Sequence, residues 1–211
     1  MLEKIKVVPL AAESLGVRSM CTYVETPDLR ILLDAGVSLC PMRFGLPPHP
    51  REFEAIIQCR EKISKTAEKA GVITISHYHY DHHTPSFQDW VVNWTEADET
   101  AKQIYQNKVV LLKNPREQIN SSQRERGWMF AKTGGRYAKE LINADSQTFV
   151  FGETTVKFSE PVFHGPENSE MGWVLMASVS FQNEKFMFAP DVQGPMSNRP
   201  VQIILEEKPQ L

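Results

Sequence analysis

The sequence predicts a mixed α/β protein in which a layered β-sheet carries helices on its outer faces. Short strand-like segments come first, helices then alternate with single strands, and strands return in the last third. A central apolar run ends in a group of histidines, which is where open α/β sheets hold their functional sites. With 211 residues, 41% of them apolar, the chain suits one globular domain over residues 1–211.

The first third predicts three strands. Short apolar and β-branched runs, separated by glycine, proline and charged residues, lie at residues 4–10, 17–26 and 30–36. We expect these early strands to pair as hairpins, with helices added over them later in the chain.

A helix and a buried strand follow a proline-rich loop at residues 41–50. Pro50 suits the first turn of a helix that runs to about Ala70, and Gly71 ends it. The next run, at residues 72–76, is continuously apolar rather than alternating. That pattern predicts a strand that is buried on both faces.

The middle of the chain is polar and mixed. It predicts a helix at 96–106, a strand at 108–112 and helical character over 115–142, broken near Gly134 and Gly135. Strands return in the last third, and Gln182 with Asn183 is expected to form a hairpin turn. A short helix starts near residue 198, and the four late strands lie at 147–152, 154–160, 172–181 and 184–190.

The composition indicates a cytoplasmic protein. No apolar run approaches the ~20 residues that span a bilayer, and the first residues lack the hydrophobic stretch and cleavage signature of a signal peptide. Cys21, Cys40 and Cys59 are odd in number and form no CxxC pair. We therefore expect buried or half-buried free thiols in a reducing compartment.

One segment is basic in a chain of net charge −3. Residues 113–140 contain seven Lys or Arg and three Glu, a local net charge of +4. This indicates either a surface for an anionic partner or a solvated helix face. Trp128, Phe130 and Tyr137 lie among these charges, and aromatic residues beside cations can stack nucleobases. Their near-helical spacing favours a place in the core instead.

The segment SHYHYDHH, residues 76–83, contains four of the six histidines. In an extended or turning segment His77 and His79 point the same way and can converge on one ion. Asp81 and His82 follow a change of direction and can bind a second ion. Imidazole and carboxylate suit zinc, and also iron or manganese. The alternatives are a chance histidine-rich loop and a metal-free His/Asp base pair, and the latter needs no extra histidines.

The signature HYHYDH resembles that of the metallo-β-lactamase superfamily, and further landmarks follow in the order typical of it. Asp34 closes an apolar strand in ILLDAG, His164 follows a strand in EPVFHG, and Asp191 follows another in FMFAPDVQGP. The resemblance covers nearly the whole chain. It is strongest to a mainly archaeal group of predicted metal-dependent hydrolases, on the segments DAGVSLCPMRFGLPPHP and SHYHYDHHTP. It implies an αββα sandwich.

The resemblance also implies roles. A hydroxide held between two metals, with Asp81 beside it, would be the nucleophile, because a bound ion lowers the pKa of water toward ~7. Asp34 would orient a metal-bound histidine through a hydrogen bond. The implied ligands are His77, His79 and His164 for the first ion, Asp81 and His82 for the second, and Asp191 as the bridge.

Each of these residues also has a structural interpretation. His164 could be a buried, hydrogen-bonded histidine, Asp191 a turn residue, and Asp34 a partner for backbone N–H groups at a turn. His83 is extra to the motif and is expected to start a helix or to support the ligands. His49 lies between two prolines and is expected on the loop surface.

One departure from the superfamily pattern concerns the second ion. The superfamily usually supplies a last histidine after one further strand, whereas no histidine follows His164 in this sequence. The second half of the sandwich therefore looks shortened at the C-terminus. The consequences left open are a weakly held or missing second ion, a ligand from another chain, and pairing of the open sheet edge with another copy.

The functional hypothesis is a metal-dependent hydrolase that uses one or two zinc ions, with manganese or iron as alternatives. The expected substrate is a small molecule or a phosphoester, with a weak preference for the phosphoester, since Arg and Lys of residues 113–140 could border the cleft. Nucleic acid is a weaker alternative. The competing hypotheses are a metal-binding scaffold without turnover and a di-iron redox enzyme of the same fold.

Overall fold

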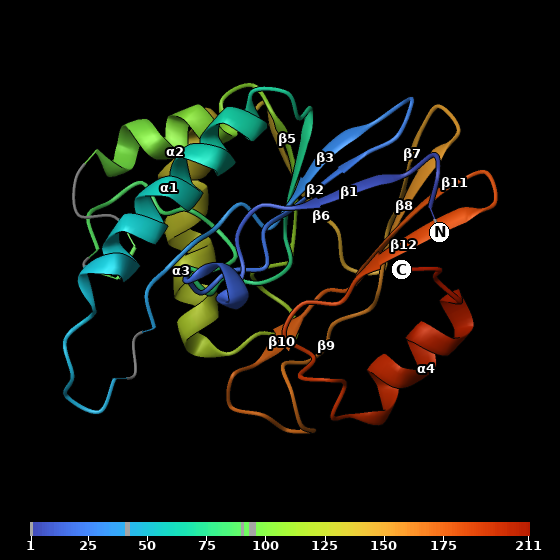
Figure 1. The fold of residues 1–211 in the computed structure, drawn as a ribbon. Coiled ribbons are helices and arrows are strands. Elements are labelled where there is room, and N and C mark those ends of the chain that lie inside the picture. The colour runs from blue at the N-terminus through green and yellow to red at the C-terminus, as the bar shows by residue number, and fades with distance from the viewer. Residues whose placement is uncertain (1, 41–42, 90, 93–95) are drawn as a thin grey trace.

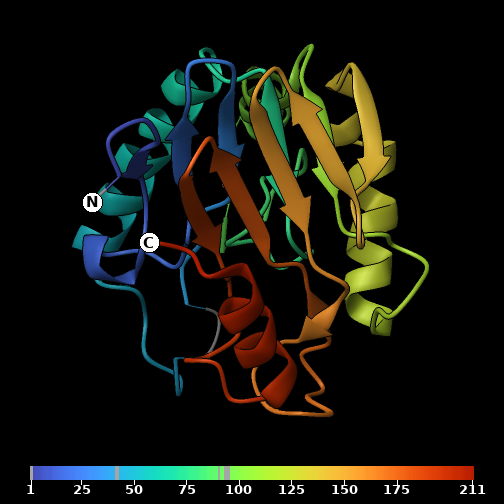
Figure 2. The same ribbon diagram turned by 90° about the vertical axis from the view of Figure 1, so that its right-hand side faces the viewer.

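The computed structural model describes residues 2–40, 43–89, 91–92 and 96–211. Two β-sheets pack face to face, and helices lie on the outer side of each (Figure 1). Seen from the side of the second sheet, one helix crosses its outer face near the lower ends of the strands (Figure 2). These layers are those of the expected αββα sandwich, which is confirmed.

The first sheet has six strands in the order β1-β2-β3-β4-β5-β6. The first three pair antiparallel, as the hairpin expectation requires, and β3 to β6 run parallel. Because parallel strands end at the same edge, the residues after β3, β4 and β5 lie close together. The strands are β1 Lys6–Pro9, β2 Thr22–Glu25, β3 Arg30–Leu33, β4 Val72–Ile75, β5 Val109–Leu112 and β6 Glu140–Asn143.

The second sheet is antiparallel and has the order β12-β11-β8-β7. Gln182, with a φ of 54°, lies in the turn between β11 and β12, as predicted. A separate two-stranded sheet joins β9 to β10. The strands are β7 Thr148–Phe151, β8 Thr154–Phe158, β9 Val162–Phe163, β10 Trp173–Val174, β11 Ala177–Phe181 and β12 Glu184–Phe188.

Among the described residues, three α-helices cover the first sheet and one covers the second. The helix α1 begins at Pro50, and the exposed His49 caps it. The His49 ring accepts a hydrogen bond from the Arg51 N–H, and the His49 N–H donates one to the Glu52 carboxylate. His49 is thus on the surface, as expected, but it also fixes the start of a helix. The helices are α1 Pro50–Ala67, α2 Ala97–Tyr105, α3 Ser121–Lys132 and α4 Asn198–Glu207, with 3-10 turns η1 Glu13–Leu15 and η2 Gly134–Tyr137.

Alternating side chains along the central strands fill two cores. In β3, Ile31 and Leu33 contribute to the core between the sheets, whereas Leu32 belongs to the core beneath the helices. From the second sheet, Val156 and Phe158 join the inter-sheet core. Burying such side chains stabilises the fold by ~1.5–3 kcal/mol each.

Three element predictions need correction. Helical character over 115–142 holds for α3 and for the 3-10 turn at 134–137, but it is wrong for residues 115–120, which form a loop, and for residues 140–143, which form β6 and complete a backbone ladder on β5. The single strand at 172–181 is two strands, β10 and β11, which pair in different sheets. The first helix ends at Ala67, three residues before the predicted end. The proline-rich loop begins in residues 41–42, which lie outside the described residues.

Other expectations concern single side chains. Cys21 and Cys59 are buried free thiols and Cys40 is half-buried, as predicted. Phe130 lies in the core, but Trp128 is 56% exposed, so the core interpretation is wrong for Trp128. No helix in the described ranges is long and apolar enough to cross a membrane.

Candidate metal centre

The predicted site residues meet at one end of the two sheets. Asp34 follows β3, residues 77–83 follow the neighbouring β4, His164 follows β9, and Asp191 follows β12 with two residues between them. The Leu175 N–H, in the segment between β10 and β11, donates to the Ser76 carbonyl oxygen at 3.1 Å. This contact joins the histidine loop to the second half of the sandwich.

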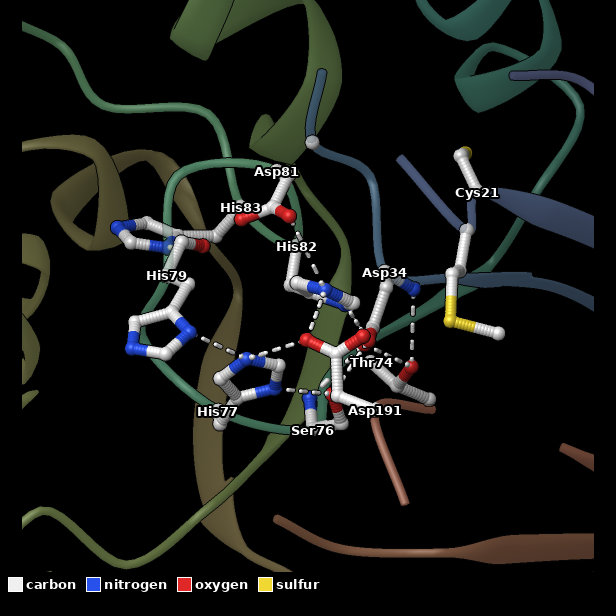
Figure 3. Close-up of polar contacts among 12 residues, drawn as sticks. Cys21, Asp34, Thr74, Ser76, His77, His79, Asp81, His82, His83 and Asp191 are labelled. Carbon is white, nitrogen blue, oxygen red and sulfur yellow. Dashed lines mark hydrogen bonds and ion pairs between the residues drawn. The ribbon is translucent and has the colours of Figure 1, made fainter. Parts of the chain in front are cut away.

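Three imidazoles surround one oxygen of Asp191. Its Oδ2 atom lies 2.9 Å from His164 Nε2, 3.1 Å from His82 Nε2 and 3.3 Å from His77 Nε2. The ring of His77 in turn contacts His79, with 3.0 Å between Nε2 and Nδ1 (Figure 3). The residues therefore converge in sets whose donor atoms lie within 4.8 Å of one another: His77, His79, His164 and Asp191; Asp81, His82 and Asp191; and Asp34, His77 and His82.

Several of these buried atoms lack a hydrogen-bond partner. Among the described residues, this holds for His82 Nε2, both ring nitrogens of His164 and Asp191 Oδ2. Buried polar atoms are nearly always paired, and each exception needs a cause. Nitrogen and carboxylate donors pointing at one another are the donor set that a divalent cation such as zinc requires. The residues present therefore fit a metal.

Asp34 holds the histidine loop from the neighbouring strand end. Its Oδ1 accepts from the Ser76 N–H at 2.8 Å and from the Thr74 hydroxyl at 3.2 Å, and its Oδ2 accepts from the Ser76 hydroxyl. His82 Nδ1–H donates to Oδ2 at 2.7 Å. That bond orients the His82 ring so that its Nε2 atom faces Asp191 (Figure 3).

Gly36 allows the chain after Asp34 to lie directly on the histidine loop. A Cβ atom at this position would stand 2.3 Å from the His83 nitrogen and 2.6 Å from the His82 nitrogen. No side chain fits at those distances. The glycine in DAG is therefore part of the site's construction.

The ionisation of the cluster depends on burial and on its mutual contacts. Burial alone would raise the pKa of Asp191, but His164, His77 and His82 hold it far below its usual range. Burial lowers the pKa of His79 to about 4, with the neighbouring His164 adding to the effect. Burial, followed by His82, also lowers the pKa of His77. Burial alone would also lower the pKa of His82, but Asp81, Asp191 and Asp34 raise it well above its ordinary value. Neutral His77 and His79 beside an ionised Asp191 are in the protonation states that metal binding needs, whereas His82 must release a proton to bind an ion.

His83 supports the loop from inside. It is almost fully buried, and its Nδ1 atom lies 3.0 Å from the His79 carbonyl oxygen. Burial lowers its pKa to about 3. Its ring packs against Tyr78, Tyr80 and Phe130, and it belongs to none of the candidate ligand sets. The expectation of a supporting residue fits this placement, and no helix begins here.

Gln123 is a residue of this site that sequence reasoning missed. It lies on α3 and is fully buried, accepting a hydrogen bond from the Tyr78 N–H at 3.3 Å and donating to the Met171 carbonyl at 2.6 Å. It thereby links the histidine loop to the loop that follows His164. In the sequence it is one polar residue in the polar run SSQRER, and nothing there marks it as buried or identifies its partners.

A cavity of about 420 Å³ opens beside the cluster, and His79 and Asp81 line it. Two guanidinium groups lie in its wall. Arg18 Nη2 is 3.1 Å from Asp81 Oδ2, and Arg126, from α3, stacks over the Tyr80 ring with its Cζ 4.6 Å from the centroid. The basic segment thus borders the cleft through Arg126. Lys113 and Arg136 of that segment pair with Asp residues elsewhere.

Comparison with solved structures gives fold-level likenesses. The structure of an isothiocyanate hydrolase from Delia radicum gut bacteria aligns with a TM-score of 0.53 and 12% identity, over 92% of this chain and 67% of that one. A metallo-β-lactamase fold protein, YhfI from Bacillus subtilis, aligns with a TM-score of 0.46 and 14% identity, over 88% and 62%. The solved structures that align with this chain thus include one described as a metallo-β-lactamase fold protein.

Comparison with curated sequences gives much closer relatives. A UPF0282 protein of Methanocaldococcus jannaschii is 46% identical over 207 residues, which are 98% of this chain and 70% of the relative. One from Pyrobaculum aerophilum is 47% identical over 205 residues, 97% of this chain and 67% of the relative. No family model matches the sequence. The extent and level of these identities show that the chain belongs to the UPF0282 family of archaeal proteins.

Proposed function

We propose that this protein is a metal-dependent hydrolase with its active site at the histidine loop. The observation that carries the proposal is the set of buried, unpartnered donor atoms on His82, His164 and Asp191. Unpaired polar atoms in such number are costly in a folded protein, at ~1–3 kcal/mol each. A cation that binds all of them removes that cost.

Zinc is the ion we assign. Three imidazoles and a carboxylate match its preferred ligands, with manganese and iron as the alternatives that the same donors permit. The set of His77, His79, His164 and Asp191 would hold the first ion. Asp81 and His82 share Asp191 with it and would hold a second.

The residues around the ion have distinct tasks. When bound, zinc would acidify a water molecule so that it attacks as hydroxide near neutral pH. Asp81 is the cluster carboxylate that also lines the cavity, so it would position that water against the substrate. Asp34, with no exposed surface, would keep His82 oriented rather than touch the substrate.

A phosphoester is the substrate class that we favour. Arg18 and Arg126 present two guanidinium groups in a cavity that also contains the two acidic side chains Asp81 and Asp89. Guanidinium groups match the oxygens of a phosphate and remain charged at all working pH values. A neutral lactam or thioester would leave Arg126 without a counter-charge, whereas Arg18 already pairs with Asp81.

Metal content is the first test. We expect elemental mass spectrometry to find at least one zinc ion per chain in protein purified without added metal, and the ion to be lost in His77→Ala. His49→Asn is the matched control, since it removes a histidine outside the cluster and keeps a helix-capping side chain. A metal-free wild type, or equal metal in His77→Ala, would refute the proposal. Iron in place of zinc would favour the redox alternative.

Turnover is the second test. We expect zinc-loaded protein to hydrolyse bis(p-nitrophenyl) phosphate faster than p-nitrophenyl acetate or a chromogenic lactam. Arg126→Gln should raise the KM for the phosphodiester and leave the KM for the neutral ester unchanged. Bound zinc without turnover of any of these substrates would favour the scaffold alternative.

A further inference from the structure

The outer side of α3 carries a second hollow that the metal centre does not use. It has a volume of about 500 Å³, and Trp128 lines it with 56% of its surface exposed. Three cations surround the indole, and none of the lining residues is acidic. The cationic groove, as we name it, is lined by Pro115, Arg116, Arg124, Gly127, Trp128, Ala131 and Lys132.

The positively charged side chains of this groove are not neutralised by acidic neighbours in the described part of the chain. Within the described part of the chain, Arg116, Arg124 and Lys132 make no ion pair. Other cations of the basic segment are paired, Lys113 with Asp145 and Arg136 with Asp98. Like charges gathered around an exposed aromatic ring repel one another, and an anionic ligand would remove that repulsion.

Helical geometry sets the groove and the metal cavity on two sides of the same helix. Arg124 and Trp128 are four residues apart and share one face of α3. Ser122 and Arg126, also four apart, face the cavity of the metal centre. A helix with its side chains is ~10–12 Å across. A ligand that contacts both sides must therefore be extended and carry several negative charges.

We propose that the cationic groove binds single-stranded nucleic acid, with a base stacked on Trp128 and phosphates on Arg116, Arg124 and Lys132. Exposed aromatic rings beside cations bind unpaired bases irrespective of sequence, because every base has a flat π-face. A paired duplex hides those faces. Resting on the proposed function, the strand would pass Arg126 and present a phosphodiester to the metal centre.

Binding can be measured apart from catalysis. A fluorescein-labelled oligouridine of about 12 nucleotides, a length within the usual range of single-strand sites, is titrated with protein in EDTA and followed by anisotropy. We expect Trp128→Ala to weaken binding roughly tenfold or more, and Trp128→Phe to retain most of it. The double variant Arg124→Ala with Lys132→Ala should reduce the slope of the logarithm of affinity against the logarithm of salt concentration by about 1.4, at roughly 0.7 per contacted phosphate.

The control removes two exposed lysines from the opposite side of the helical layer. Lys62→Ala with Lys69→Ala, in α1 and just after it, should bind the oligonucleotide like the wild type. Equal loss in this control, no binding by the wild type, or equal affinity of Trp128→Ala would overturn the proposal. Competition by uridine monophosphate as strong as by the oligonucleotide, at equal phosphate concentration, would also overturn it.

Failure of the proposed function has a different signature. If the protein binds the oligonucleotide through Trp128 but contains no metal, the groove stands and the hydrolase proposal falls. If it contains zinc and cleaves phosphodiesters but does not bind the oligonucleotide, the hydrolase proposal stands and the proposal for the cationic groove falls. Since Trp128 is largely exposed, its substitution should leave the circular dichroism spectrum and the Tm unchanged.

Discussion

At the scale of single residues, Asp34 holds the histidine loop in place through several hydrogen bonds. It accepts hydrogen bonds from the backbone of Ser76, from two hydroxyl groups and from His82, and no part of it is exposed. Its φ of 53° is left-handed, a conformation that Asp and Asn tolerate better than most residues. Asp34→Asn therefore removes the negative charge and replaces one hydrogen-bond acceptor with a donor, with little change in backbone preference.

We predict that Asp34→Asn lowers zinc affinity by about 10- to 100-fold, the usual effect of removing a partner of a metal-bound histidine. The amide cannot accept at both ends, so the orientation of His82 is no longer enforced. Affinity can be measured by competition with a chromogenic chelator. Asp28→Asn is the control, because Asp28 caps a remote turn by accepting from the Glu153 N–H. Unchanged affinity in Asp34→Asn would mean that Asp34 serves the fold alone.

Gly36 makes a prediction about stability. Gly36→Ala forces a Cβ atom against the backbone of His82 and His83, and overpacking typically costs ~1–3 kcal/mol. We expect the free energy of unfolding, from urea titration, to fall by at least that amount. Gly71→Ala is the matched control, since a Cβ atom there meets nothing within 4 Å. Equal stability of the two variants would contradict the close approach of the loops.

At the scale of elements, the carboxylate of Glu207 links α4 to the second sheet, in addition to the apolar packing of Ile203. Glu207 Oε1 lies 2.5 Å from Lys157 Nζ of β8, and Oε2 lies 2.7 Å from Lys185 Nζ of β12. Burial alone would raise the pKa of Glu207, but the two lysines hold it below its ordinary value. A lowered pKa in the folded state means that the ionised form stabilises folding.

The lowered pKa of Glu207 determines how its contribution to stability changes with pH. The stabilisation by Glu207 is full above its unfolded pKa of ~4.3 and is lost as the pH falls through the lower folded pKa. We predict that Glu207→Gln is less stable than the wild type at neutral pH and that the difference closes in acid. Thermal melts of both proteins across pH 3 to 7 provide the test. Glu206→Gln, which breaks an exposed pair with Arg199, should change little at any pH.

Elements also show how far the sequence determines this structure. The histidine loop could be predicted because its ligands are local and follow a buried strand. The strand β6 could not, because residues 140–143 become a strand by bonding β5 across an intervening helix. The contacts of Gln123 and Arg18 join segments 45 or more residues apart, and no local pattern encodes such a pairing. Trp128 was misassigned because helical spacing cannot say which face of a helix is covered.

At the scale of the whole molecule, the candidate ligands come from both halves of the sandwich. His77, His79 and His82 follow a strand of the first sheet, whereas Asp191 follows a strand of the second and His164 follows the small β9–β10 sheet. An ion bound to all of them would join the two halves at the end where the cluster lies. The inter-sheet core holds the sheets together along their length, independently of any metal.

We therefore predict that removing the metal loosens this end of the sandwich and leaves the inter-sheet core folded. An ion present at about 100 times its Kd contributes ~2.7 kcal/mol, so chelation should lower the Tm by about 5–10 °C for a chain of this size. Amide hydrogen exchange should speed up in residues 76–84 and 161–194 and remain slow in β2, β3 and β11. Asp191→Asn, already short of the bridging carboxylate, should respond less to the chelator. Faster exchange spread evenly over both sheets would instead mean that the ion is needed for the whole fold. If neither the Tm nor the exchange rates change on chelation, the cluster binds no ion.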